Sequence, residues 1–473
     1  MTGTPRRTIP AVRVARTTEA GSPRGLVKPG AEGTSTQVGW ADAAAVDRVV
    51  AVAVEARREW ARTSAENRAA RLRAIAAELR SRVAEFGVVI ASESGKRVNE
   101  ADGEVEFSAK YFDWFADAAE RAEVEQRLST AGRSFRVLQH PIGVVAAVGT
   151  WNFPLSIPAR KIAAAVAAGC PTILKASERT PEAANLLVEL CERHLPTGVI
   201  GSIMGDGAIL VPALIDHPDV AAVTFTGSTI IGARVGARAA ATQTRSVLEL
   251  GGRAPFIVRA DADIDQAIEN LIVAKFRNSG QSCIAANNVF VHSSLRDRFW
   301  EAIAARISRV RPGDPFDPDS DFGPLIDESA VRRLETILIE AAGAGMSVVR
   351  GARGTGPNQM RAALVECTDD LAIWTEELFG PVIPLRSFEN EDDLVDEINA
   401  WGTGLAGYIC SSDITSAAAL ASRLRIGIVG INNGAPNTPE VPLGGFGSSG
   451  VGREGGMSGY LEFIEEQTVS IAT

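Results

Sequence analysis

Histidine, cysteine and long apolar runs are scarce in this chain, and each shortage excludes a class of protein. Four histidines occur in 473 residues, and the CxxH formed by Cys191 and His194 has no second pair of ligands nearby, which argues against a zinc site. Five cysteines, an odd number spread widely, do not form a disulfide framework, so we expect reduced thiols and no bound metal. No apolar run approaches the roughly 18 residues that cross a membrane.

Clustered positive charge is missing as well. The chain has 48 Lys and Arg residues against 58 Asp and Glu, a formal net charge of −10, and we find no basic cluster for nucleic acid or an anionic membrane. Small molecules are therefore the expected partners. Arg6 and Arg7 are similar to a twin-arginine signal, but no apolar segment follows them, so we expect a cytoplasmic protein.

The length and the residue pattern predict two α/β domains. Residues 1 to 40 are rich in Pro, Gly, Thr and Arg and predict an extended arm, whereas apolar spacings of three and four over residues 41 to 114 predict helices. Four strand-helix units between residues 142 and 241 predict a parallel sheet, with ligands at the carboxyl ends of its strands. A second α/β series begins at residue 254.

The usual dinucleotide fingerprint, GxGxxG between a strand and a helix, is absent. The sequence "GTGLAG" at 402–407 follows a helical pattern and runs into an apolar segment, which is the wrong context. The sequence "GDGAIL" at 205–210 has the right context but lacks the third glycine. A nicotinamide cofactor would therefore be held in another way.

Two other features at the carboxyl edge of the predicted sheet are candidates for a cofactor site. Gly227 and Gly232 bracket a strand-to-helix turn whose backbone N–H groups suit a diphosphate; the alternative is a turn glycine and a packing glycine. Lys175 and Glu178 follow another strand, where a carboxylate can accept hydrogen bonds from two ribose hydroxyls. A solvated ion pair is the alternative there.

Three further residues have the chemistry of a covalent catalytic site. Glu249 interrupts an apolar strand, where desolvation would raise its pKa as a general base requires; the alternative is a structural carboxylate bonded to backbone. Cys283, in "GQSC", is either a nucleophile or a small buried side chain. Asn152 follows a buried strand and either caps it or donates to an oxyanion, a role worth about 3–4 kcal/mol.

These residues belong to short motifs that resemble one family. The chain resembles the NAD(P)-dependent aldehyde dehydrogenase superfamily from about residue 40 to its end, and several independent motifs in register make the match specific. The motifs are "WNFP" with Asn152, "KASERTP" at 175–181, "FTGS" at 225–228, "ELGG" at 249–252, "GQSC" at 280–283, "EELFGP" at 376–381 and "GREGG" at 452–456.

The resemblance implies an α/β fold with three parts. A Rossmann-like NAD-binding domain is expected over residues 1–119 and 142–250, and an α/β catalytic domain over residues 251–448. A small β oligomerisation arm is expected from residues 120–141 and 449–473. Members of this family are usually dimers or tetramers, so a homodimer or homotetramer is expected.

The resemblance also implies residue roles. Cys283 would attack the aldehyde to form a thiohemiacetal, Asn152 and the Cys283 backbone N–H would hold the oxyanion, and Glu249 would activate water against the resulting thioester. The resemblance implies that Lys175 takes part in both catalysis and cofactor binding. Glu377 and Phe379 would position the nicotinamide end of the cofactor. The predicted cofactor-binding residues are Trp151, Lys175, Glu178, Gly227, Ser228, Gly232, Glu377 and Phe379.

Within the superfamily, the motifs are most similar to those of succinate-semialdehyde dehydrogenases. That similarity places Arg160 and Arg277 around the far end of the substrate, where a carboxylate would join them; the alternative is that one or both sit in ordinary salt bridges. A short semialdehyde with a terminal carboxylate is therefore the expected substrate, with a broad-specificity enzyme for aromatic or aliphatic aldehydes as the alternative. Glu178 would repel a 2′-phosphate, which favours NAD over NADP.

The same residues argue against three rival functions. A CoA-acylating relative would generally lack the water-activating Glu249. A cysteine hydrolase would need a histidine partner, and none of the four histidines lies in a matching motif. A non-catalytic protein on this fold would not be expected to keep the whole catalytic set. Ala176, Arg253 and Gly447 depart from common family residues, which puts the substrate and the kinetics in doubt more than the reaction type.

Overall fold

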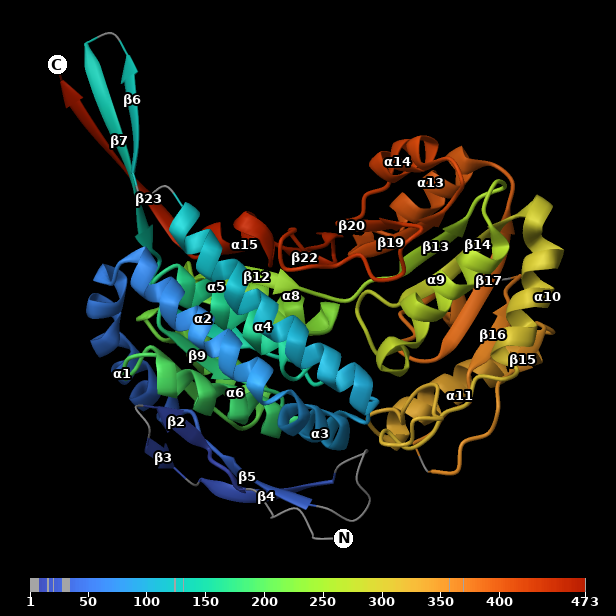
Figure 1. Ribbon diagram of the computed structural model, residues 1–473, viewed down its shortest axis with the longest axis horizontal. Helices are drawn as coiled ribbons and strands as arrows, with labels where there is room; N and C mark the ends of the chain where they lie inside the picture. Colours follow the sequence, from blue (N-terminus) through green and yellow to red (C-terminus); the bar gives the residue numbers. More distant parts are fainter. Residues whose placement is uncertain are drawn as a thin grey trace.

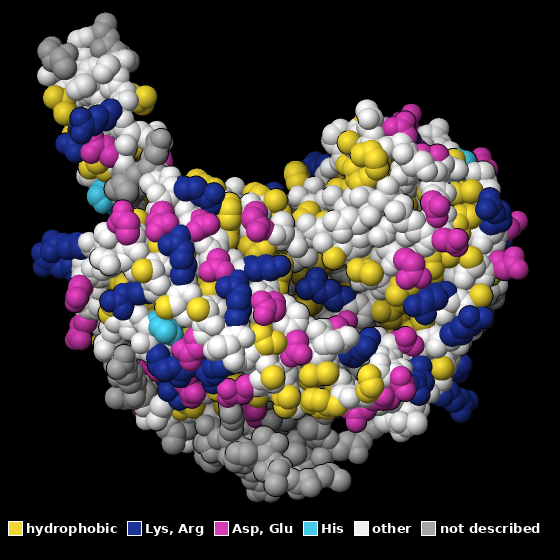
Figure 2. Space-filling model, viewed as in Figure 1, with side chains coloured by type: hydrophobic (Ala, Val, Ile, Leu, Met, Phe, Trp, Pro, Cys, Tyr) yellow, Lys and Arg dark blue, Asp and Glu magenta, His cyan; other side chains and the backbone are white. Residues whose placement is uncertain are grey.

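Two sheets covered by helices and a projecting three-stranded arm make up the molecule (Figure 1). The computed structural model describes residues 8–14, 17–19, 21–27, 35–122, 125–130, 132–356, 358–368 and 370–472. Acidic and basic side chains are interspersed over one face of the surface, and its outline is notched between the arm and the lobe of the second sheet (Figure 2). No helix within the described ranges is long and apolar enough to cross a membrane.

The first sheet has eight strands in the order β22-β12-β11-β8-β9-β10-β2-β3, and its five central strands are parallel. Both faces of β8 are covered, because Val145 and Ala147 face one apolar core while Ala146 and Val148 face another. The strands are β2 (Val12–Val14), β3 (Thr17–Glu19), β8 (Val144–Val148), β9 (Thr172–Lys175), β10 (Ile200–Ile203), β11 (Val220–Thr226), β12 (Arg245–Glu249) and β22 (Gly450–Val451).

The helices of this part follow the predicted pattern. Ser64 and Asp206 cap α2 and α7 through their side chains, Pro181 opens α6, and α5 is buried along its whole length. The helices are α1 (Ala44–Arg62), α2 (Ala65–Ser81), α3 (Val83–Ser94), α4 (Val98–Arg121), α5 (Ser156–Ala167), α6 (Pro181–His194), α7 (Gly207–Asp216) and α8 (Thr229–Thr242).

The second sheet has seven strands in the order β15-β16-β17-β14-β13-β19-β20, all parallel except the edge strand β15. The strands are β13 (Ala254–Val258), β14 (Ala286–His292), β15 (Val348–Arg350), β16 (Ala363–Glu366), β17 (Val382–Phe388), β19 (Ala406–Cys410) and β20 (Ile428–Ile431). The helices beside it are α9 (Ile264–Phe276), α10 (Arg296–Ile307), α11 (Glu328–Gly343), α12 (Ala372–Thr375), α13 (Glu391–Ala400) and α14 (Ile414–Arg423). The α/β class predicted from the sequence is confirmed.

The arm is an antiparallel sheet in the order β23-β7-β6 that stands away from the body (Figure 1). It is built from β6 (Glu125–Thr130), β7 (Arg133–Pro141) and β23 (Ile464–Ala472), and α15 (Gly456–Leu461) leads into β23. Leu128, Val469 and Ile471 are exposed on it, which is unusual for large apolar side chains on a two-faced solvated sheet.

The extended arm expected over residues 1 to 40 is wrong for the described part of that region. There β2 and β3 extend the first sheet, and a small sheet forms in the order β1-β5-β4 from β1 (Thr8–Ile9), β4 (Ser22–Val27) and β5 (Ser35–Trp40). These strands are two to six residues long, too short for a period to show in the sequence. A two-stranded ribbon of β18 (Thr403–Gly404) and β21 (Phe446–Gly447) completes the fold.

Candidate active site

The order of the first sheet creates a switch point between β8 and β11. From β8 the chain proceeds outward through β9 and β10 on one side, and through β11 and β12 on the other. Ligands of such sheets bind outside the carboxyl ends of the strands at this point. Trp151 and Asn152 follow β8 there, Gly227 and Ser228 follow β11, and Glu249 is the last residue of β12.

Cys283 lies on a loop whose backbone is held in an uncommon conformation. Asn278, Ser279 and Gly280 have φ values of 51°, 59° and 78°, three left-handed residues in succession. A Cβ at position 280 would lie 2.4 Å from the carbonyl oxygen of Gly380, so this position requires glycine. Such strain persists where the surrounding structure enforces it, and it concentrates at functional sites.

The structure brings Asn152 against the loop of Cys283, although the two are far apart in the sequence. The Asn152 side chain is buried, and its Nδ2 donates to the carbonyl oxygen of Gln281 at 3.0 Å. An amide nitrogen carries two hydrogens, so one remains for a bound oxygen atom. The Cys283 residue itself is partly exposed, so its thiol can meet a small molecule.

Glu249 is a buried carboxyl group with an unused oxygen. It is 2 % exposed, and its Oε1 has no hydrogen-bond partner among the described residues. Burial and then the negative charge of Glu454 raise the pKa of Glu249 to about 8, against the opposing charges of Arg160 and Lys161. Most of this group is therefore protonated at pH 7, and it becomes a base as the pH passes 8.

The charge of Glu249 acts on the thiol of Cys283. Burial and then the charge of Glu249 raise the pKa of the Cys283 thiol to about 12, against the charge of Arg160. The thiol is therefore protonated at neutral pH. Its thiolate fraction is smaller than the few per cent expected of an ordinary cysteine.

Glu454 is an important residue of this site that was not predicted. It forms buried ion pairs with Arg160 and with Lys161, the latter at 2.5 Å, and accepts a hydrogen bond of 2.9 Å from Thr224. Burial opposes its ionisation, but the two cations hold the pKa of Glu454 below its usual value. "GREGG" contains Glu454, yet the sequence did not show which cations it meets, because they lie 293 positions or more away.

Arg160 requires a correction. The sequence argument held that its buried charge needs an anion from the substrate, and the structure shows that Glu454 already provides that anion. Arg160 also lies with its guanidinium 5.9 Å from the centre of the Tyr111 ring. The salt-bridge alternative therefore describes Arg160, and its assignment to the substrate carboxylate loses its basis.

Arg277 remains available. It is half-buried, its guanidinium lies 5.2 Å from the centre of the Phe153 ring, and it forms no ion pair with a carboxylate in the part of the chain described here. Phe153 is the neighbour of Asn152, so Arg277 lies close to the segment that carries the predicted oxyanion donor. Cation–π contact can hold a guanidinium without neutralising it.

The residues predicted to hold the sugar and the ring of a cofactor lie at the same edge. Lys175 Nζ is 2.6 Å from Glu178 Oε2, and the lysine is buried while the glutamate is half-exposed. Burial raises the pKa of Glu377 to about 7, and a Cβ at Gly251 would lie 2.3 Å from its Oε2. The arrangement leaves carboxylates at two places where ribose hydroxyls could donate.

Trp151 and Phe379 meet across the two sheets. Their ring centres are 5.6 Å apart in an edge-to-face arrangement, and Phe379 has a φ of 52°, uncommon for a bulky residue. Both rings line a pocket of about 200 Å³, together with Gln281 of the nucleophile loop and Arg333. The contact thus joins the motifs "WNFP" and "EELFGP", which belong to the two lobes.

The two glycines of the β11–α8 turn lie against apolar side chains. Ser228 is the N-cap residue of α8, but its side chain makes no capping hydrogen bond, so the first N–H groups of the helix are left for a ligand. A Cβ at Gly232 would lie 2.1 Å from a methyl group of Leu250, and one at Gly227 would lie 2.5 Å from the Phe225 ring. Close packing against Leu250 and Phe225 explains why both positions hold glycine, and the cofactor role of the two glycines remains a prediction.

This donor set fits a dinucleotide. A helix N-terminus without a side-chain cap suits a diphosphate, and the two carboxylates suit ribose hydroxyls. No group of three or more potential metal ligands was found in the described ranges.

Comparison with known proteins identifies the family. The model of the aldehyde dehydrogenase family matches residues 17–469. The chain belongs to the aldehyde dehydrogenase family. It is therefore an oxidoreductase that acts on aldehydes with NAD or NADP, and the resemblance inferred from the motifs is confirmed.

Relatives of this aldehyde dehydrogenase carry several substrate names. The mitochondrial succinate-semialdehyde dehydrogenase of Arabidopsis thaliana is 37 % identical over 429 residues, which cover 89 % of this chain and 81 % of that protein. The 3-sulfolactaldehyde dehydrogenase of Pseudomonas putida is 36 % identical over 434 residues, or 91 % and 89 % of the two chains. The crystal structure of succinate-semialdehyde dehydrogenase from Burkholderia pseudomallei superimposes with a TM-score of 0.94 at 34 % identity and covers 98 % of each chain. The fold of this enzyme is thus the aldehyde dehydrogenase fold.

Proposed function

We propose that this aldehyde dehydrogenase oxidises a short semialdehyde with a terminal carboxylate, such as succinate semialdehyde, to the acid through Cys283. The observation that carries the proposal is the convergence of three groups from separate elements. The charge of Glu249 acts on the thiol of Cys283, and the Asn152 amide donates to the Gln281 carbonyl oxygen in the loop of Cys283.

The chemistry follows from these groups. The Cys283 sulfur attacks the aldehyde carbon and gives its proton to a base, and the carbonyl oxygen becomes an oxyanion that accepts hydrogen bonds from Asn152 Nδ2 and the Cys283 backbone N–H. A bound nicotinamide supplies the hydride acceptor, and loss of the hydride from the same carbon leaves a thioester on Cys283. Glu249 then takes a proton from water, whose oxygen attacks the thioester, and the acid leaves as the thiol is restored.

The cofactor is proposed to be NAD, with NADP less favoured. Glu178 is half-exposed and paired with Lys175. Its carboxylate would accept hydrogen bonds from the hydroxyls of the adenosine ribose and would repel a 2′-phosphate. We place the diphosphate at Gly227 and Ser228 and the nicotinamide end between Glu377, Phe379 and Trp151. Lys175 would hold the ribose on the buried side of the same edge.

The substrate assignment is carried by Arg277. It is half-buried beside Phe153 without a carboxylate partner among the described residues, so a substrate carboxylate would meet an unneutralised guanidinium. The names of the Arabidopsis and Burkholderia relatives agree with this class. A broad-specificity aldehyde dehydrogenase is the second candidate. Arg160 is paired with Glu454, so Arg277 alone of the two arginines is left to bind a substrate carboxylate.

We also propose that the β6-β7-β23 sheet is an oligomerisation arm and that the molecule is a homodimer or homotetramer. The arm stands away from the body and exposes Leu128, Val469 and Ile471, which a partner subunit would cover. We further propose the domain division 1–119 with 142–250, 251–448, and 120–141 with 449–473; the first boundary falls inside α4, and β22 in the last part pairs with β12 of the first sheet.

Stopped-flow measurement of NADH tests the chemistry. We expect Cys283→Ala to abolish aldehyde oxidation, and Glu249→Gln to give a single-turnover burst of NADH followed by slow turnover, because the thioester forms but water is not activated. Cys191→Ala, at a buried thiol on α6, is the control and should keep full activity. Turnover by the Cys283 variant would contradict the mechanism, whereas a missing burst in the Glu249 variant would remove only its role against the thioester.

A pair of aldehydes tests the substrate. Arg277→Ala should raise KM for succinate semialdehyde about tenfold or more, the typical worth of a charged hydrogen-bonded pair, and change KM for butanal less than about twofold. Arg97→Ala, which removes a neighbouring half-buried cation bonded to the Asp321 carbonyl, is the matched control. Equal effects on both aldehydes, or better kcat/KM with hexanal or benzaldehyde in the unmodified enzyme, would favour the broad-specificity alternative.

A further inference from the structure

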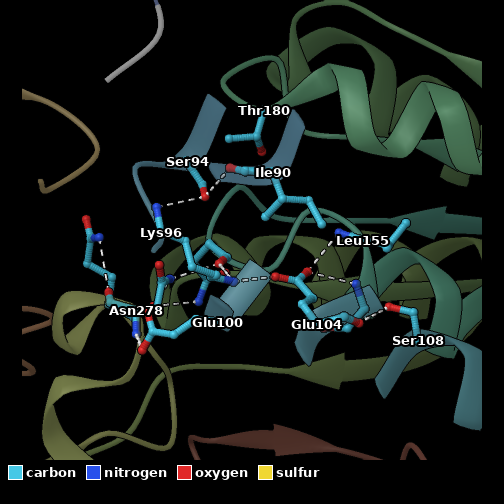
Figure 3. A network of polar contacts seen from close by, with 12 residues as sticks. Ile90, Ser94, Lys96, Glu100, Glu104, Ser108, Leu155, Thr180 and Asn278 are labelled. Carbon is cyan, nitrogen blue, oxygen red and sulfur yellow. Dashed lines mark hydrogen bonds and ion pairs between the residues drawn. The ribbon is translucent and has the colours of Figure 1, made fainter. Parts of the chain in front are cut away.

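Two chain segments carry the proposed reacting groups, and a buried polar network joins them. One segment is residues 152–156, with Asn152 at its start, and the other is residues 278–283, with Cys283 at its end. The network consists of Lys96 and Glu104, from the turn before α4 and from α4, and of Asn278 from the second segment; Figure 3 shows these three residues close together. We call Lys96, Glu104 and Asn278 the clamp.

Glu104 holds the far end of the first segment. Its Oε1 accepts hydrogen bonds from the backbone N–H groups of Leu155 and Ser156, both at 3.0 Å, and its Oε2 pairs with Lys96 Nζ (Figure 3). The glutamate is 2 % exposed. The carboxylate therefore satisfies the N–H groups where α5 begins, for which Leu155 has no side-chain cap to offer.

Lys96 holds the near end of the same segment. Its Nζ donates to the backbone carbonyl oxygen of Asn152 at 3.2 Å and lies 3.9 Å from the centre of the Phe153 ring. The lysine is 1 % exposed, and a buried ammonium group is tolerated only when its contacts are well made. Lys96 and Glu104 together hydrogen-bond to the backbone at both ends of the segment 152–156.

Asn278 connects this segment to the second one. Its Nδ2 donates to the Asn152 carbonyl oxygen at 2.8 Å and to the Gln281 carbonyl oxygen at 3.1 Å. Gln281 O is also the acceptor of the Asn152 side chain. One amide nitrogen thus ties together the carbonyl groups of Asn152 and of the residue two positions before Cys283.

We propose that the clamp is a positioning device for catalysis: Lys96, Glu104 and Asn278 touch neither substrate nor cofactor, but set the Asn152 amide at the distance and angle from Cys283 that the oxyanion needs. The inference rests on the proposed role of Asn152. An oxyanion donor works only when it is held within about half an ångström of its productive position, and a misplacement of about 1 Å can cost roughly 100-fold in rate.

Asn278→Gly is the direct test. Glycine adopts the left-handed conformation of residue 278 without strain, and the variant loses the two donated hydrogen bonds while the unpartnered Oδ1 of Asn278 loses nothing. Ser279→Gly is the matched control. Ser279 is equally buried and left-handed, and its one side-chain hydrogen bond goes to Gly323, outside both segments.

The readout is the single-turnover rate of NADH formation, with the Kd of NAD and the thermal midpoint measured beside it. We expect Asn278→Gly to lower this rate about tenfold or more, the typical worth of misplacing one oxyanion donor, with a Kd and a midpoint like those of Ser279→Gly. An equal fall of the rate in the two variants would overturn the proposal, because loss of any buried hydrogen bond in the loop would then suffice.

A double variant separates the clamp from the function it serves. If Asn278 acts through Asn152, adding Asn278→Gly to Asn152→Ala should lower the rate further by less than about twofold. Additive losses would overturn the clamp and leave Asn152 as oxyanion donor. If Asn152→Ala alone leaves the rate unchanged, the proposed role of Asn152 fails, and the clamp fails with it.

A second pair of residues keeps the proposal testable if the Asn278 variant does not fold. Lys96→Met with Glu104→Gln removes the buried ion pair as a unit and keeps an oxygen for the N–H groups of Leu155 and Ser156. We expect the same slow NADH formation with unchanged NAD affinity. A normal rate in this folded double variant would overturn the role of the Lys96–Glu104 half of the clamp.

Discussion

The ionisation of Glu249 should govern the release of the acid product. Burial and the charge of Glu454 raise its pKa to about 8, and a carboxyl group with a raised pKa is protonated, and inactive as a base, below that value. The ionised fraction is about one tenth at pH 7 and about nine tenths at pH 9, so thioester hydrolysis should rise roughly tenfold between them. Activity is thus lost as the pH falls through 8.

Glu454→Gln should move this dependence to lower pH. The variant removes the negative charge that opposes ionisation of Glu249, and it leaves the positive charges of Arg160 and Lys161, which favour ionisation, without their partner. A decrease of one pKa unit, about 1.4 kcal/mol, would raise the ionised fraction at pH 7 from about one tenth to about one half. Hydrolysis at pH 7 should then be about fivefold faster, provided that the variant folds.

The assay is kcat against pH from 6 to 10, under conditions where a burst of NADH shows that hydrolysis of the thioester limits turnover. Glu454→Asp is the control, because it keeps the negative charge and should keep the rise of kcat with pH centred near pH 8. Thermal midpoints at each pH separate loss of folding from loss of base. If the rise of kcat with pH in Glu454→Gln stays centred near pH 8 or moves to higher pH, the electrostatic reasoning is refuted. A kcat that does not change with pH in the unmodified enzyme would refute the assignment of Glu249.

Three further outcomes are expected. Because the pKa of the Cys283 thiol is raised to about 12, its alkylation by iodoacetamide without cofactor should be slow at pH 7 and rise about tenfold per pH unit to pH 10, measured by mass spectrometry; fast labelling at pH 7 would contradict this. Glu178→Ser should narrow the preference of kcat/KM for NAD over NADP, and equal values for the two cofactors in the unmodified enzyme would contradict the cofactor proposal. Leu128→Asp with Ile471→Asp should reduce the oligomer mass found by light scattering, because charge replaces apolar surface on the arm; an unchanged mass would count against the arm as the interface.

Local sequence was enough for the elements and for the family. Apolar residues spaced three and four apart predicted α1 to α4. Short β-branched runs predicted β8 to β11, because a strand that is buried on both faces is apolar at nearly every position. Segments without such a pattern were missed, including β13, β16 and β19, and the strands before residue 40 were taken for an extended arm. β13 contains Pro255 and β19 contains Gly407, and both residue types are depleted in strand interiors, so neither segment is typical of a strand in the sequence.

Sequence also determined which chemical groups matter, and the tertiary structure decided how they are partnered. Cys283, Glu249 and Asn152 could be named because an isolated thiol, a carboxylate in an apolar strand and an amide after a strand are locally anomalous. Arg160 has the same local anomaly as Arg277, yet the fold pairs Arg160 with Glu454 and leaves Arg277 without a carboxylate among the described residues. Charge interactions act through space at a few ångströms, so a separation of 294 positions does not weaken the pair of Arg160 and Glu454, and no spacing in the sequence reveals it.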